Sequence, residues 1–184
     1  MLSDNLKPLN VLHPTTANGS SASDIYVMNI TDVDGNLLVS GPDKTGIICL
    51  NYAFGVQLPM QRDIANTERT AGRPVFQDMT FTKMADLSTP TLMAACAAAT
   101  NLKTTKFHVG RTVGGEYANL LDFEMENTIV STFKHLGEGG GVLPYDEFTL
   151  SFTAIKLTYS HSKFDNMPGG STDFGWDLST NLPA

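Results

Sequence analysis

Residues 147–159 have the sequence EFTLSFTAIKLTY, in which apolar and polar side chains alternate. The apolar residues change parity midway, from Phe148, Leu150 and Phe152 to Ile155, Leu157 and Tyr159. Alternation with a period of two predicts a strand with one buried face. Since a slip of one residue sends side chains to the opposite face, we expect a bulge or sharp coil near Thr153 and Ala154, as barrels use.

Further strands are predicted along the chain, of which residues 46–58 alternate clearly and residues 24–30 are apolar on both faces. They cover residues 24–30, 46–58, 73–84, 104–113 and 117–133. Turns are expected at residues 32–36 and 114–115, and a mixed-charge loop at residues 60–72. In the second strand, the predicted buried face consists of Ile48, Leu50, Tyr52, Phe54, Val56 and Leu58.

One strong helix signal interrupts the strands, at residues 89–101. Thr89 is expected to be the N-cap and Pro90 the first helical residue, before a run rich in alanine. Many strands, one short helix and no alternating βα pattern predict a mainly antiparallel sheet or barrel. We expect a flexible N-terminal extension over residues 1–23 and a single domain with an ordered tail over residues 24–184.

The composition of this chain of 184 residues limits the classes of partner that it is expected to bind. Only 17% of the residues are charged, which favours a surface that is easy to bury against another subunit. The net charge of −7 leaves no basic patch for nucleic acid. No apolar run reaches the roughly 18 residues of a membrane span, so membrane insertion is not expected. The start, MLSDNLKPLN, does not resemble a secretory signal peptide.

A search for chemistry along the sequence predicts no catalytic, metal or cofactor site. The four histidines, at positions 13, 108, 135 and 161, are far apart and lack a metal-ligand spacing. The glycine-rich GEGGG at residues 137–141 lacks the lysine of a phosphate loop, and no serine has a nucleophile-elbow pattern. Cys49 and Cys96 are expected to be buried packing residues, although a single disulfide between them stays open.

Two acidic patterns have structural explanations. Residues 32–36 (DVDGN) resemble the start of a calcium-binding loop. The match fails because the glycine comes too early and no acidic residue stands at the twelfth position of the loop. The stripe of Asp122, Glu124 and Glu126 is expected to be a solvated strand face, or a channel lining if the chain forms a ring.

Four motifs, in order, resemble the haemolysin-coregulated protein (Hcp) family of type VI secretion over residues 24–176. The densest is FQDMTFTK at residues 76–83, followed by STPTLMAAC at 88–96; the family has V-Q-D-L-S-F-T-K and S-P-x-L-M-x-A-C. The basic turn with paired glycines at 111–117, the strand at 148–159 and FGWD at 174–177 also match.

The resemblance implies a β-barrel of two packed sheets with one short helix at its side. It implies homohexameric rings with a wide lumen that stack into a secreted tube. It further implies a contractile sheath around the tube, a VgrG-type spike at its tip and small effector proteins in the lumen. Export would then proceed directly from the cytoplasm, and the chain would be a structural subunit with no catalytic residue.

Two regions are singled out within this resemblance. Ala53 aligns with a family position that often holds a small polar residue facing the lumen, so we expect different or weaker cargo retention here. For ring stacking, the mixed-charge loop points to Arg62, Asp63, Glu68 and Arg69, with solvated loop charges as an equally good explanation.

Two other functions stay open at this point. A phage-type tail tube protein would share the architecture without the secretion system. A small-ligand-binding β-barrel would be monomeric or dimeric, with a filled or ligand-sized interior.

Overall fold

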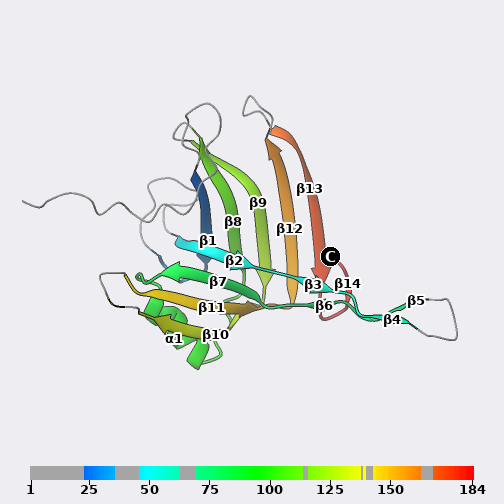
Figure 1. Ribbon diagram of the computed structural model, residues 1–184, viewed down its shortest axis with the longest axis horizontal. Coiled ribbons are helices and arrows are strands. Elements are labelled where there is room, and N and C mark those ends of the chain that lie inside the picture. Colours follow the sequence, from blue (N-terminus) through cyan, green and yellow to red (C-terminus); the bar gives the residue numbers. More distant parts are fainter. Residues whose placement is uncertain are drawn as a thin grey trace, which may run out of the picture.

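The computed structural model describes residues 23–35, 46–62, 69–113, 116–137, 139, 143–162 and 168–184 (Figure 1). The predicted N-terminal extension up to residue 22 and the predicted turn at 114–115 lie outside these residues. The elements, in chain order, are β1 (Ser23–Ile30), β2 (Ile47–Ala53), β3 (Val56–Gln57), β4 (Met60–Arg62), β5 (Arg69–Ala71), β6 (Val75–Phe76), β7 (Met79–Met84), α1 (Thr89–Ala97), β8 (Thr105–Val113), β9 (Glu116–Glu126), β10 (Ile129–Leu136), β11 (Tyr145–Ser151), β12 (Ala154–Ser162), β13 (Pro168–Asp177) and β14 (Leu182–Pro183).

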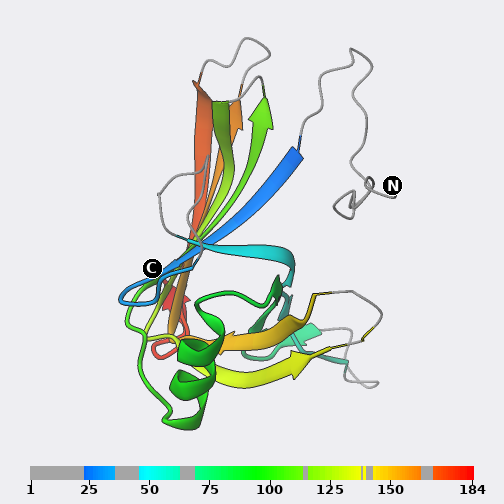
Figure 2. The same ribbon diagram turned by 90° about the vertical axis from the view of Figure 1, so that its left-hand side faces the viewer.

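Ten strands form one antiparallel sheet in the order β10-β11-β7-β2-β1-β8-β9-β12-β13-β14. The sheet bends sharply, so that β10, β11 and β7 pack below the longer strands β8, β9, β12 and β13 (Figure 2). The predicted fold class, mainly β and antiparallel with one short helix, is confirmed. In the described part of the chain, the strands at the two ends of this order, β10 and β14, do not pair with each other.

Sharp corners carry the chain between the two parts of the sheet. The strand predicted over residues 117–133 is two strands, β9 and β10, separated at Asn127, whose φ is 51°. Phe152 and Thr153 form the second corner, between β11 and β12, and the amide of Thr153 donates to the carbonyl of Glu126 at 3.0 Å. The predicted irregularity near Thr153 is confirmed; it is a corner at which the chain exchanges neighbours.

The predicted buried face of the second strand is wrong at both ends, and at its far end Val56 and Leu58 are 54% and 50% exposed. Ile47 and Cys49 are buried, whereas Ile48 and Leu50 are 45% and 39% exposed. A shift in the pairing of β2 with β7 between Cys49 and Asn51 reverses the alternation, so that only beyond it does Tyr52 pack against the core. A bulge has this effect because it adds one residue to one strand of a pair.

The helix begins at Thr89, as in the predicted range, but ends at Ala97 rather than residue 101. Ser88, rather than Thr89, is the N-cap, and Pro90 lies in the first turn. The helix ends at Ala97, because Ala99 has a φ of 50° and cannot continue it. The amide of Thr100 then donates to the carbonyl of Ala95 at 2.9 Å, which satisfies one of the last helical carbonyls.

Aromatic rings fill the space between the two parts of the sheet. The Phe107 ring lies at the centre, with centroids 4.9 Å from both Tyr52 and Phe81 and 5.9 Å from Phe123. Such contacts each add about 1 kcal/mol beyond the burial of apolar area. They tie β2, β7, β8 and β9 together, which positions the outward faces of these strands.

Candidate functional site

Ala53, the predicted lumen residue, lies on the solvent side of β2 and is exposed. Cross-strand pairing aligns it with Thr80 on β7, Thr149 on β11 and Thr132 on β10, and we call these four residues the hydroxyl row. The hydroxyls of Thr132 and Thr149 are 2.7 Å apart. Ala53 is thus the one member of the row whose side chain cannot form a hydrogen bond. That this face lines a lumen stays a prediction.

The predicted loop at residues 60–72 is in part a two-stranded ribbon. β4 and β5 pair antiparallel, and together with the β3–β6 pair they extend from the body of the molecule as an arm (Figure 1). The pairing places Arg62 directly opposite Arg69. Asp63 and Glu68, the other two predicted stacking residues, lie outside the described residues.

The base of the arm is attached to the C-terminal segment. The Arg73 guanidinium donates to the carbonyl of Leu178 at 3.0 Å, and the amide of Gly72 donates to the carbonyl of Pro59 at 2.8 Å. A two-stranded ribbon is marginally stable by itself. These bonds therefore set the direction in which the arm leaves the sheet.

A buried ion pair, which the sequence analysis missed, connects the lower strands to the helix. The Lys83 ammonium on β7 lies 2.8 Å from the Asp146 carboxylate on β11, and both side chains are fully buried. Lys83 shares its strand parity with Met79 and Phe81, and Asp146 shares its parity with Phe148 and Leu150. The sequence does hold a signal for this pair, because each strand has a charged residue at a position where its alternation predicts an apolar side chain.

Further polar groups satisfy this ion pair. The Lys83 ammonium also lies 2.8 Å from Asp86, and the Thr89 hydroxyl donates to Asp146 at 2.6 Å. The His135 ring nitrogen Nδ1 is 2.7 Å from the other Asp146 oxygen. Burial raises the pKa of Asp146, but hydrogen bonds from Lys83, Thr89 and His135 outweigh burial and hold that pKa below its usual range.

His108 pairs with Asp122 across β8 and β9. Lys106 and Glu124 form the next pair along these strands, at 3.7 Å. The predicted acidic stripe is therefore partly neutralised by its neighbour strand and borders a groove of about 250 Å³. Among the residues that the structure describes, no three histidine, cysteine or acidic side chains gather to hold a metal ion.

The two cysteines are not bonded to each other. Cys49 is buried, as predicted, and burial raises the pKa of its thiol, which disfavours the reactive thiolate. Cys96 is only partly buried, against the prediction, although it packs against the core.

Comparison with known families gives a match over most of the described fold. Residues 27–159 match the family model described as "Type VI secretion system effector, Hcp". The protein hcp1 of Pseudomonas aeruginosa is 30% identical over 109 residues, which cover 59% of this chain and 67% of that protein.

Solved structures share the fold. One described as "Structure of a type six secretion system protein" has a TM-score of 0.81 and 20% identity, covering 88% of this chain and all of the other. Hcp1 from Salmonella typhimurium has a TM-score of 0.69 and 18% identity, covering 88% of this chain and 99% of the other. No helix in the described ranges is long and apolar enough to span a membrane. Because the family model covers well over half of its length, the chain belongs to the Hcp family of type VI secretion proteins.

Proposed function

We propose that the chain is a structural subunit, not an enzyme, of the inner tube of a type VI secretion machine. Six copies close into a ring, rings stack into a tube, and a contractile sheath drives the tube out of the cytoplasm. A VgrG-type spike caps the tube, and small effector proteins travel in its lumen. The observation that supports this best, beside family membership, is the arm, which extends beyond the body of the subunit.

The arm is the proposed element of ring stacking, with Arg62, Asp63, Glu68 and Arg69 as its charged residues. Arg62 and Arg69 are directly opposite each other, an arrangement of like charges that is unfavourable within one ribbon. Acidic groups of the adjacent ring relieve this repulsion, and a chain with a net charge of −7 supplies them. Stacking contacts between unlike surfaces do not close, so they extend into a tube.

The hydroxyl row is the proposed cargo-facing surface of the lumen. Its threonines present hydrogen-bonding groups without a large apolar side chain. Ala53 interrupts the row at β2, which favours weaker capture of cargo than a hydroxyl at this position.

Native mass spectrometry and negative-stain imaging test the assembly. Six chains of 19.9 kDa give a ring of about 120 kDa (6 × 19.9). Open rings of this mass are the expected result. A monomer or dimer at every concentration would contradict the proposal and favour a ligand-binding barrel. Rings that stack in the purified protein, and that stop stacking when Arg62 and Arg69 are both replaced by alanine, would assign stacking to the arm.

A further inference from the structure

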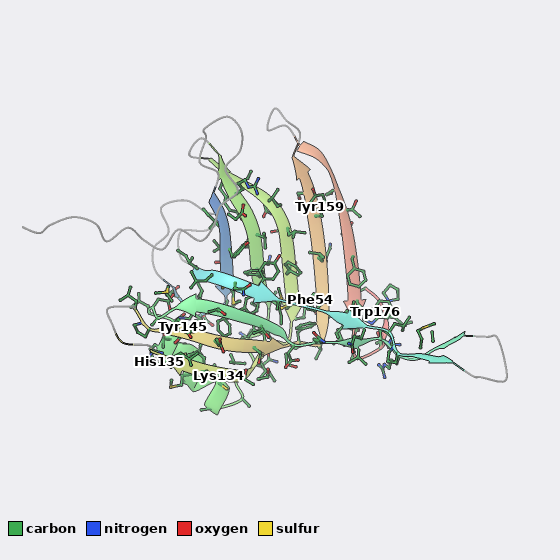
Figure 3. All side chains as sticks on the ribbon, in the orientation of Figure 1. Phe54, Lys134, His135, Tyr145, Tyr159 and Trp176 are labelled. Atoms are coloured by element: carbon green, nitrogen blue, oxygen red, sulfur yellow. The ribbon has the colours of Figure 1, made fainter. Side chains whose placement is uncertain are left out.

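We propose that a cavity at the C-terminal end of α1 binds a small aliphatic α-amino acid in its zwitterionic form. The cavity has a volume of about 330 Å³ and lies between the turn that follows β1 and the segment that joins α1 to β8 (Figure 2). The helix packs against β10, on which Figure 3 labels Lys134 and His135, so the cavity lies at this end of the molecule. This binding activity goes beyond the proposed tube function and does not depend on it.

The floor of the cavity is apolar and consists of small side chains. Ala94, Ala95 and Ala98 contribute from one side of α1, and Val33 and Leu102 contribute from the two flanking segments. Three of these residues, Val33, Ala95 and Leu102, are buried members of the hydrophobic core. Because alanine side chains leave space above the helix, the cavity reaches the range of about 300–1,000 Å³ that is typical of small-molecule sites. Such a floor accepts a short aliphatic side chain.

Two residues of opposite charge stand at the rim of the cavity. Asp32 comes from the turn after β1, Lys103 comes from the segment after α1, and both are exposed. Within the described ranges, neither the carboxylate nor the ammonium has an ion-pair partner, and the two groups do not pair with each other. A purely cationic ligand would be repelled by Lys103, and a purely anionic ligand by Asp32. A molecule that carries both an ammonium and a carboxylate satisfies both residues.

The end of α1 gives this ligand its orientation. A helix has a partial negative charge at its C-terminal end, and α1 has no basic residue in its last turn to offset that charge. The ammonium of the ligand therefore lies toward the helix end and Asp32, and its carboxylate lies toward Lys103. Thr100, which also lines the cavity, supplies a hydroxyl that can donate to the carboxylate.

Hydrogen bonds within the chain hold both walls of the cavity in place. The amide of Val33 closes the turn that carries Asp32 with a hydrogen bond of 3.2 Å. The amide of Leu102 donates to the carbonyl of Thr128 at 2.8 Å, and the amide of Thr128 donates to the carbonyl of Lys103 at 3.1 Å. Asp32 and Lys103 both have a left-handed backbone, with φ of 64° and 61°, and such conformations gather at ligand clamps. Walls that are already ordered lose less entropy when a ligand binds.

Saturation-transfer difference NMR of the purified full chain with leucine tests the binding. Two analogues of leucine separate its charges, because isoamylamine lacks the carboxylate and isocaproate lacks the ammonium. We expect leucine to bind with a Kd of about 1 mM or tighter, and each analogue to bind at least about tenfold more weakly. An analogue that binds as tightly as leucine, or the absence of saturable leucine binding, would overturn the proposal.

Variants of the chain test whether leucine binds in this cavity. Asp32→Asn and Lys103→Gln each remove one charge of the rim, and Ala94→Leu fills the space above the helix. Asp34→Asn, in the same turn as Asp32, and Ala97→Leu, on the same helix as Ala94, are the matched controls, because neither residue is among those that line the cavity. Thermal unfolding by circular dichroism checks that each variant keeps the cooperative transition of the parent.

We expect the three cavity variants to raise the Kd for leucine by at least about fivefold and the two controls to keep the Kd of the parent. Unchanged affinity in the three cavity variants would place leucine elsewhere on the chain and overturn the proposal. Equal weakening in the controls and the cavity variants would likewise overturn it, because the loss would then not follow from contacts in the cavity.

Discussion

Lys83 and Asp146 form an ion pair of 2.8 Å in which both side chains are excluded from solvent. The pair joins β7 to β11 and, through Thr89, also joins both strands to the start of the helix. Removal of one partner from a buried pair leaves an uncompensated charge. The pair therefore fixes the arrangement of strands whose other face carries the hydroxyl row.

Replacement of Lys83 by methionine is expected to lower the free energy of unfolding by about 3–5 kcal/mol, because the buried Asp146 charge loses its counterion. Urea unfolding of the chain measures this change. The double variant Lys83→Met with Asp146→Leu should recover part of the loss, since the Asp146 charge is removed, whereas the nearly buried Asp86 still lacks its counterion. A loss below about 1 kcal/mol for the single variant would contradict this account.

The stability of the chain is expected to decrease in acid. The pKa of Asp146 is lowered in the folded chain from a reference value of 3.8, so its carboxylate contributes stability that is fully present above about pH 4. This contribution is lost as the pH falls through the lower, folded-state pKa. Unfolding free energies measured between pH 6 and pH 2 should show a steeper decrease for the parent than for Asp146→Asn. Equal pH dependence of the unfolding free energy in the parent and in Asp146→Asn would argue against this contribution of Asp146.

Gly110 lies directly against the ring of Tyr117. A Cβ atom at this position would lie 2.3 Å from two ring carbons, at a point where β8 and β9 shift register. Gly110→Ala is therefore expected to destabilise the chain by about 1–3 kcal/mol through overpacking. In the Tyr117→Ala background the same substitution should cost much less. An equal cost in both backgrounds would show that the backbone, not the ring, excludes a side chain.

Ala99 has a left-handed backbone conformation just beyond the helix, with a φ of 50°. Glycine adopts this conformation without strain, so Ala99→Gly should stabilise the chain by about 1 kcal/mol. Differential scanning calorimetry should show a melting temperature about 2–4 °C higher. Ala97→Gly, inside the helix, is the matched control and should lower the stability. A decrease for both variants would contradict the proposed cause.

Ala53→Ser completes the hydroxyl row across β2, β7, β11 and β10. If the row faces the lumen, assembled rings of this variant should retain more of a candidate effector in a pull-down than the parent does. Ser151→Ala, on the same face of β11 but outside the row, is the control. Equal capture by parent and variant would remove the proposed role of Ala53.

Much of the fold could be predicted from local pattern. Alternation located most of the long strands, and the change of parity after Phe152 predicted an irregularity within one strand where the structure has a corner between β11 and β12. The alanine-rich run after Pro90 predicted the one helix. These features depend on neighbouring residues alone, which is why they are visible without the fold.

Other predictions failed because they depend on distant strands. Nothing local distinguishes Ile48 from Cys49, and the bulge that buries the cysteine exists only where β2 meets β7. The arm was expected to be a loop, since its residues are polar and its pairing is short.

The sequence by itself determined the strand periods, the short helix after Ser88 and the membership of the Hcp family. Only the tertiary structure decided which face of β2 is buried, that Lys83 meets Asp146, and that Ala53 joins three threonines in one row. The reason is that periodicity follows from the geometry of one strand, whereas register and bend follow from how strands from distant parts of the chain exclude water together.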